Sequence, residues 1–124
     1  MNDRDQFKQK SNENWKAAEV LRKDFKNAAV NRYYYSLYQA IRYWADAKNV
    51  FHCSDFVGDV HATVANIVGN NCGKNAREMR GIVNDMREQR VIADYSLDDV
   101  VEEEVQPIIQ MASAARAEFL SLRA

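Results

Sequence analysis

Two histidines and a row of arginines are the side chains of this sequence that could act on a phosphodiester. The histidines are His52 and His61. An imidazole exchanges protons near neutral pH, and guanidinium groups bind phosphate and stabilise a charged phosphorane. The arginines recur at nearly helical spacing, so they favour a phosphate-binding stripe, although a solvated face held by ion pairs would look the same. The candidate RNA- or nucleotide-binding residues are Arg77, Arg80, Arg87 and Arg90.

Motifs for other chemistries are missing from the sequence. It contains no glycine-rich phosphate loop, no HExxH, no GxSxG and no Cys/His cluster at metal-ligand spacing. Cys53 and Cys72 have no CxxC partner, so we expect two free thiols. We therefore predict neither a metal ion nor a cofactor. His61 and His52 are weak catalytic candidates, since a lone histidine is often an ordinary surface or core group.

Composition predicts a single all-α domain spanning residues 1–124. Four glycines and one proline are few for 124 residues, and no segment alternates apolar and polar residues for long. We expect an up-and-down bundle of four to five helices. The polar N-terminus and the lack of an apolar run of about 20 residues predict a cytoplasmic protein that does not enter a membrane.

The segment 27–50 carries the strongest helical pattern and three consecutive tyrosines. At 100° per residue its main apolar residues share one face, while further aromatic residues flank that face. Such a helix is contacted on more than one side, either in the centre of a bundle or at a dimer interface. The tyrosines could instead stack on bases. The expected buried face comprises Val30, Tyr34, Leu37, Ile41 and Trp44, with Tyr33, Tyr35, Tyr38 and Arg42 on its flanks.

Helix boundaries follow from capping residues and breakers. Asn27 and Ser96 are predicted to cap the second and the last helix, with Asp99 in the first turn of the latter. Phe25 is expected to close the buried stripe of the first helix. Pro107 should kink or break the last helix, because proline lacks an amide hydrogen. The predicted helices cover about 3–25, 27–50, 60–68, 75–92 and the residues from 96 onward.

Charge is unevenly distributed near the end of the fourth predicted helix. Arg90 and Asp94 are one turn apart and can form an ion pair, and Tyr95 can place its hydroxyl at the end of the bundle. The same group could equally form a recognition surface. The acidic residues between positions 94 and 104 are typical of the start of a helix, where the macrodipole favours negative charge. They are Asp94, Asp98, Asp99, Glu102, Glu103 and Glu104, with no base among them.

Two segments resemble motifs of the HEPN superfamily. Residues 28–40 read AAVNRYYYSLYQA and resemble its A-x-x-R-x-Y-Y-A-x-[FY]-x-A helix, with Ser36 at the position of a small residue. Residues 90–95 read RVIADY and resemble the R-x-x-A-D-Y element of a branch of small stand-alone prokaryotic members, in which a histidine often lies near the third helix, as His61 does. The residues of the helix motif are Arg32, Tyr34 and Tyr35.

The resemblance implies a helical bundle that commonly forms homodimers. The superfamily includes RNases, RNA-binding domains and toxins of toxin–antitoxin pairs, some neutralised by a nucleotidyltransferase that modifies a tyrosine; Tyr95 is the matching position here. Catalytic members carry R-x4-6-H. This chain departs from that motif, because Ala93, Asp94 and Tyr95 stand where the histidine would follow Arg87 or Arg90. The resemblance therefore leaves open whether the protein is an enzyme.

Three functions remain open at this point. The first is the HEPN component of a toxin–antitoxin or defence module, paired with a minimal nucleotidyltransferase and acting on or binding RNA. The second is an atypical metal-independent RNase in which Arg87 and Arg90 bind phosphate and the fold supplies His61 or His52. The third is a non-catalytic module that binds RNA, a nucleotide or a protein.

Overall fold

The computed structural model describes residues 3–50 and 60–121, all of whose regular elements are helical. The all-α prediction is confirmed. His52 and Cys53 lie outside the described residues. No helix in the described ranges is long and apolar enough to cross a membrane. The elements are α1 (Asp3–Leu21), α2 (Lys26–Ala47), α3 (Val60–Asn71), the short 3-10 helix η2 (Gly73–Asn75), α4 (Ala76–Tyr95) and α5 (Glu102–Leu120).

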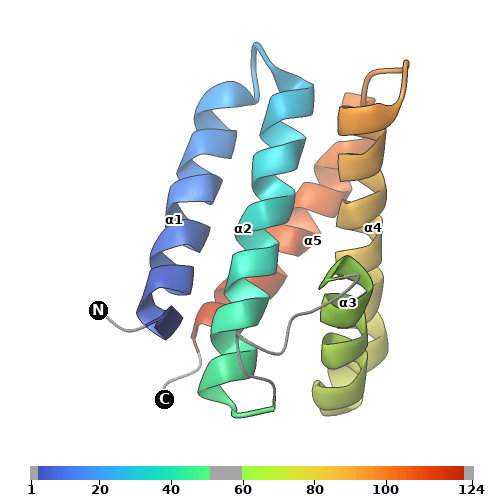
Figure 1. Ribbon diagram of the computed structural model, residues 1–124. Helices are drawn as coiled ribbons and strands as arrows, with labels where there is room; N and C mark the ends of the chain where they lie inside the picture. The colour runs from blue at the N-terminus through green and yellow to red at the C-terminus, as the bar shows by residue number, and fades with distance from the viewer. Residues whose placement is uncertain (1–2, 51–59, 122–124) are drawn as a thin grey trace.

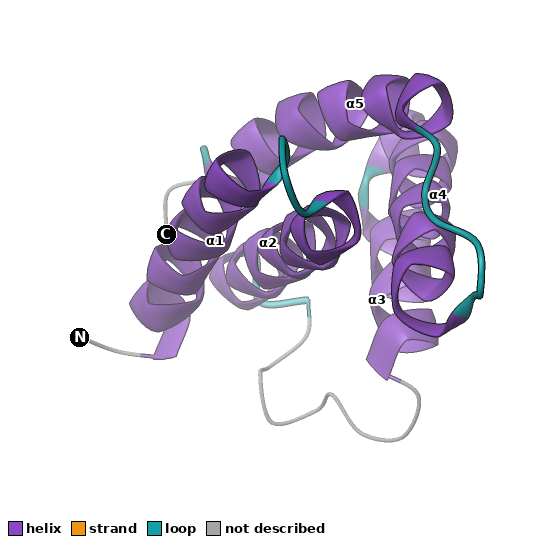
Figure 2. Ribbon diagram, turned by 90° about the horizontal axis from the view of Figure 1, so that it is seen from above, coloured by secondary structure: helices purple, strands orange, loops and turns teal. Residues whose placement is uncertain are grey.

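Helix α2 is the centre of the bundle. In Figure 1 it lies between α1 on one side and α4 on the other, with the shorter α3 alongside α4. Figure 2, seen from above, shows that α5 spans from α4 toward α1, so that the other helices lie on three sides of α2. A helix contacted on several sides needs apolar residues on more than one face, which the aromatic-rich sequence of α2 provides.

The aromatic residues of α2 form the main part of the core. Val30, Tyr34, Leu37 and Ile41 are fully buried, as expected from the helical period. Tyr33, which was predicted on the flank of that face, is fully buried as well. The two tyrosine rings are packed edge to face or tilted against aromatic residues of neighbouring helices, a geometry that aromatic pairs favour. The prediction that α2 is buried on more than one side is confirmed. Two ring pairs that tie α2 to its neighbours are Trp15 with Tyr33 at 4.7 Å and Trp44 with Phe119 at 5.1 Å.

The predicted cap of α2 was wrong, because Asn27 lies inside the helix and serves a different contact. The N-cap is Phe25, which makes no capping hydrogen bond through its side chain and is 64% exposed rather than buried. The Asn27 amide donates to Asp99 Oδ1 at 3.0 Å, and its oxygen accepts from the Val100 amide at 3.2 Å. Asn27 therefore joins the start of α2 to the segment before α5.

The predicted start of the last helix was also wrong. Ser96 ends α4, and its hydroxyl accepts a hydrogen bond from the amide of Asp98. Helix α5 begins at Glu102 after the N-cap Val101, so Glu102 rather than Asp99 stands in its first turn. Pro107 falls within this helix, which continues unbroken to Leu120. One lost backbone hydrogen bond is outweighed here by burial of the apolar face of α5, namely Val105, Ile109, Ala112, Ala115 and Phe119.

A glycine in α3 leaves room for a side chain of α4. The third helix was expected to end near residue 68, yet α3 extends through Gly69 to Asn71. A Cβ atom at Gly69 would lie 3.0 Å from Arg80 Cδ. Glycine is thus favoured at this position because the aliphatic stem of Arg80 rests against the α3 backbone.

A polar network inside the bundle connects α1, α2 and α5. Ser11 and Ser36 are completely buried, and each hydroxyl donates to the backbone carbonyl of the other residue at 2.7 Å. Arg116 Nε then donates to the Ser36 hydroxyl at 2.9 Å and to the Ser11 hydroxyl at 3.1 Å. A second nitrogen of the guanidinium donates to Asn12 Oδ1. Burial lowers the pKa of Arg116, and these neutral acceptors compensate for its lost hydration.

We expect Ser36→Ala to lower the free energy of unfolding by about 1–3 kcal/mol, because it leaves the Ser11 carbonyl without its buried donor and Arg116 with one acceptor fewer. Urea unfolding followed by circular dichroism measures the loss. Ser113→Ala, at an exposed position of α5, removes the same hydroxyl from the surface and should change stability by less than about 0.5 kcal/mol. Equal stabilities of the two variants would contradict the role of the network.

Candidate functional site

Helices α2, α3 and α4 bring several of the predicted functional residues together. Aromatic rings of α2 contact a histidine of α3 and an arginine near the C-terminal end of α4. Residues far apart in the sequence meet there, such as Tyr34 and His61, which are 27 positions apart. We call this group the arginine–tyrosine cluster; it comprises Tyr34, Tyr35, His61, Arg90, Asp94 and Tyr95.

A hydrogen bond between Tyr34 and His61 holds α3 against α2. The Tyr34 hydroxyl lies 2.5 Å from His61 Nδ1, and the two ring centroids are 5.4 Å apart. Tyr34 is 1% exposed, and burial raises the pKa of its hydroxyl far above the usual value, against the opposing effect of Arg90. The phenol is therefore neutral at physiological pH. Because the bond occupies Nδ1, any acid–base role of the His61 ring falls to Nε2.

Arg90 lies over three tyrosine rings. Its guanidinium carbon is 5.8 Å from the centroid of Tyr34, 5.7 Å from that of Tyr35 and 5.4 Å from that of Tyr95. The side chain is 11% exposed. Burial acts to lower the pKa of Arg90, but Tyr35, Tyr95 and Asp94 raise it by more. The cluster thus contains a permanent positive charge held in a fixed place, which is what recognition of an anion requires.

Asp94 accepts two hydrogen bonds on one carboxylate oxygen. Arg90 Nε donates to Asp94 Oδ2 at 3.1 Å, and Asn31 Nδ2 donates to the same oxygen at 3.0 Å. The Tyr95 hydroxyl accepts from a terminal nitrogen of Arg90 at 3.3 Å. The predicted Arg90–Asp94 ion pair is confirmed, and so is the position of the Tyr95 hydroxyl beside it. Two donors that converge on one anionic oxygen could also hold an oxygen of a phosphate.

The four predicted arginines do not act as one group. Arg87 is near enough to Tyr34 to act on the pKa of its hydroxyl, so it stands beside the cluster. Arg80 rests on Gly69 of α3, and Arg77 is exposed in the first turn of α4. Helical rise places Arg77 about 20 Å from Arg90 along α4. Arg87 and Arg90 are therefore the pair that the structure brings to the tyrosines and His61.

Other candidates from the sequence have structural roles. Tyr33 and Tyr34 are core residues and offer no face to a base, whereas Tyr35 is partly exposed and Tyr95 is 72% exposed. Arg32 is exposed and donates to Asn14 Oδ1 of α1 at 3.3 Å, on the side of α2 away from the cluster. Among described residues, no group of His, Cys, Asp and Glu could hold a metal ion.

Asn31 is a member of the site that sequence reasoning missed. It lies one helical turn before Tyr34 and Tyr35 on α2, and its amide reaches Asp94 on α4. Its position within the stretch NRYYY could have singled it out, since residues three and four apart share a helix face. The second contact that was missed is the Tyr34–His61 hydrogen bond, which depends on how α3 packs.

Comparisons with known protein families, curated proteins and solved structures return no match for this chain. The HEPN interpretation therefore rests on the motifs in residues 28–40 and 90–95.

Buried Tyr34 predicts a loss of stability in alkaline solution. The folded-state pKa of Tyr34 is raised above the unfolded value of about 10. The stability that its neutral hydroxyl contributes is therefore intact below pH 10 and is lost as pH rises above that value. The loss is up to about 1.4 kcal/mol per pH unit. Urea unfolding between pH 8 and 11 should show a shallower decline in Tyr34→Phe than in wild type. Tyr95→Phe, a change at an exposed position, is the control and should retain the wild-type slope. If Tyr34→Phe loses stability with pH as steeply as wild type, the alkaline loss does not come from Tyr34.

Proposed function

We propose that this chain is a cytoplasmic HEPN-type protein that binds RNA through the arginine–tyrosine cluster, as one component of a toxin–antitoxin or defence module. The observation that carries this proposal is the pair of donors on Asp94 Oδ2, from Arg90 and Asn31, in the same cluster as His61. Arg90 supplies a fixed positive charge, and Asn31 supplies a neutral donor. A phosphate oxygen of RNA would take the place of the carboxylate oxygen.

The rings around Arg90 suit a nucleic acid as well as a phosphate. Tyr95 is 72% exposed and Tyr35 is partly exposed, so each offers some ring surface next to the guanidinium. Stacking of a base on an aromatic ring contributes about 1–3 kcal/mol and tolerates any base. Arg87 lies beside the same rings and would contact a neighbouring phosphate. This arrangement favours a flexible single strand, whose bases are free to stack, over a duplex.

Metal-independent RNA cleavage is the second candidate function. The Tyr34–His61 hydrogen bond favours it, because a neutral phenol fixed at Nδ1 orients the imidazole. In the tautomer in which His61 Nδ1–H donates to the Tyr34 oxygen, Nε2 carries no proton. Nε2 would then take the proton of the 2′-hydroxyl as that oxygen attacks the phosphorus, and the bond to the 5′-oxygen would break as that oxygen gains a proton from solvent. Arg87 and Arg90 would stabilise the phosphorane. In this scheme His61 replaces the histidine that is absent after Arg90.

The resemblance adds two protein partners to the proposal. A second copy would form the homodimer that is common in the superfamily, and a minimal nucleotidyltransferase would act as antitoxin. Tyr95 is the residue that such an enzyme would modify, since its ring is 72% exposed. Transfer of a nucleotide from a nucleoside triphosphate to this hydroxyl, with release of pyrophosphate and of the phenolic proton, would take the acceptor from Arg90 and place negative charge in the RNA site. That modification would weaken RNA binding by charge repulsion.

Retardation of labelled single-stranded RNA in EDTA tests the RNA site. We expect Arg87→Ala and Arg90→Ala each to weaken binding about tenfold or more, because each removes a charged contact to phosphate. Lys16→Ala, which removes one positive charge at an exposed position of α1, should bind like wild type. Circular dichroism must show folded variants. Wild-type affinity in both arginine variants would refute the site.

The same samples separate cleavage from binding. If the protein is an RNase, wild type cleaves the RNA in EDTA, and His61→Ala loses cleavage while it retains retardation within about threefold. Cleavage that persists in His61→Ala would exclude this histidine from catalysis. Retardation without cleavage in wild type would assign the protein as a binding module.

Removal of the competing carboxylate should strengthen RNA binding. In Asp94→Asn the side-chain oxygen that accepts hydrogen bonds from Arg90 and Asn31 loses its negative charge. A phosphate displaces this oxygen more readily, so we expect the affinity for RNA, measured by retardation, to rise about three- to tenfold. Asp85→Asn, an exposed acid elsewhere on α4, is the matched control for net charge. Equal gains in the two variants would mean that only overall charge changed, and weaker binding by Asp94→Asn would contradict the proposed competition.

A further inference from the structure

Large exposed apolar side chains are concentrated at one end of the bundle. In the described part of the chain, Leu97 is fully exposed, Val20 is 81% exposed and Phe25 is 64% exposed. Val101 is also exposed, and the exposed ring of Tyr95 borders the group. Met111 is an exposed large apolar residue elsewhere on the described surface. We call Val20, Phe25, Leu97 and Val101 the apolar end.

Two connections form this end, and polar contacts hold them together. One joins α1 to α2 and the other joins α4 to α5; both lie at the top of the bundle in Figure 1. Asn27 contacts Asp99 and the Val100 amide across them, and Arg22 donates to Glu102 at 3.0 Å. Phe25, Leu97 and Val101 thus sit on connections cross-linked by hydrogen bonds, and Val20 lies in the last turn of α1 beside them. A surface that is fixed in advance loses less conformational entropy when it binds.

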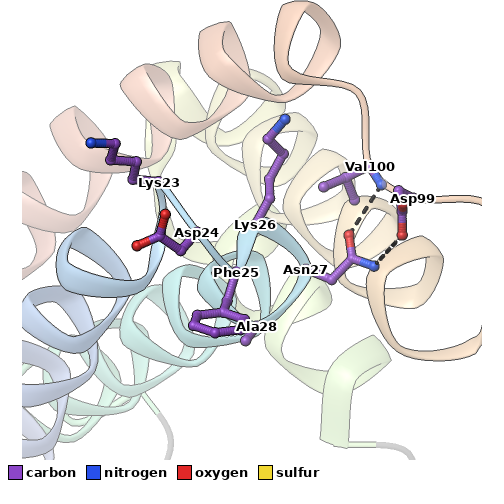
Figure 3. Close-up of a pocket in the computed structure, with 8 residues that line it drawn as sticks. All are labelled: Lys23, Asp24, Phe25, Lys26, Asn27, Ala28, Asp99 and Val100. Atoms are coloured by element: carbon purple, nitrogen blue, oxygen red, sulfur yellow. Dashed lines mark hydrogen bonds between the residues drawn. The ribbon is translucent and has the colours of Figure 1, made fainter.

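A cavity lies between the two connections. Its volume is about 540 Å³, and residues from both connections line it, including Phe25, Asp99 and Val100. Figure 3 shows the Asn27 amide bridging to Asp99 and Val100 at one side, and the Phe25 ring pointing away from the ammonium groups of Lys23 and Lys26. The cavity is large enough to receive a side chain from another molecule.

Acidic residues predominate around the apolar end. Arg22 and Lys26 both pair with Glu102, at 3.0 and 3.7 Å, so this carboxylate balances one of their two charges. Lys23 is the remaining base in residues 20–28 and 95–104. Against it stand carboxylates exposed on both connections, namely Asp24, Asp98, Asp99, Glu103 and Glu104.

We propose that the apolar end docks a partner protein whose contact surface combines apolar side chains with lysine and arginine. Apolar area would supply the affinity, and the surrounding carboxylates would select a basic partner. RNA and anionic membranes are repelled by the same charges. A second copy related by two-fold symmetry would bring this acidic surface against the same acidic surface. The surface is separate from the phosphate-binding donors, so this proposal does not depend on RNA binding.

Peptide binding followed by ¹H–¹⁵N NMR tests the docking surface. The probes are an amphipathic helical peptide of leucine and lysine, its leucine/glutamate analogue and a serine/lysine analogue. We expect the leucine/lysine peptide to shift amides at residues 20–28 and 95–101, and the two analogues to bind at least about tenfold more weakly. The double variant Phe25→Ser/Leu97→Ser should lose about tenfold or more in affinity. Met111→Ser, at an exposed apolar position elsewhere, should bind like wild type.

Several results would overturn the proposal. One is that the leucine/lysine peptide does not bind. The others are that the leucine/glutamate analogue binds as tightly as the leucine/lysine peptide, and that the amide shifts are confined to other parts of the bundle. The alternative is that a second copy of this chain covers the apolar end, and sedimentation, which measures self-association, tests it. This alternative holds if wild type self-associates and Phe25→Ser/Leu97→Ser is a monomer. Retardation of RNA by the double variant should match wild type. A loss confined to peptide binding therefore separates this surface from the RNA site.

Discussion

The burial of Tyr34 at the centre of the bundle is the constraint on which the rest of the site depends. A phenol that is 1% exposed must satisfy its hydroxyl within the protein, and His61 Nδ1 does so at 2.5 Å. That bond ties the short helix α3 to α2. It also places an imidazole among the rings over which Arg90 lies. One requirement of core packing therefore assembles a histidine, a cation and aromatic rings, the groups that a site for RNA would use.

Arg90 shows how the site balances stability against binding. Its charge is compensated by Asp94 at 3.1 Å and by three tyrosine rings. With 11% exposure, an arginine that lacked these partners would incur a large desolvation cost. A phosphate bound there, as we propose, would compete with the carboxylate for the same donors, so the free energy gained would be a difference between two similar interactions. Such binding would be weak and sensitive to salt, and Asp94 would limit its strength.

Local patterns in the sequence predicted local structure well. The helical period identified the buried residues of α2, and a spacing of four predicted the Arg90–Asp94 pair. Contacts between distant residues escaped the same reasoning. Asn27 is not a cap because Asp99 and Val100, more than 70 positions away, take its side chain. The approach of His61 to Tyr34 depends on the packing of α3, which no spacing within one helix encodes.

The C-terminal end of α4 joins the two surfaces of the molecule. Arg90, Asp94 and Tyr95 belong to the cluster, and the next residues carry the exposed Leu97 and the acids before α5. Asp94 bonds to Asn31 of α2, and Asp99 bonds to Asn27 one turn earlier on the same helix. A protein docked on the apolar end would thus contact the segment that directly follows the arginine–tyrosine cluster. If both proposals hold, the two ligands would meet at adjacent residues of this helix end, and any effect of one on the affinity of the other would be reciprocal.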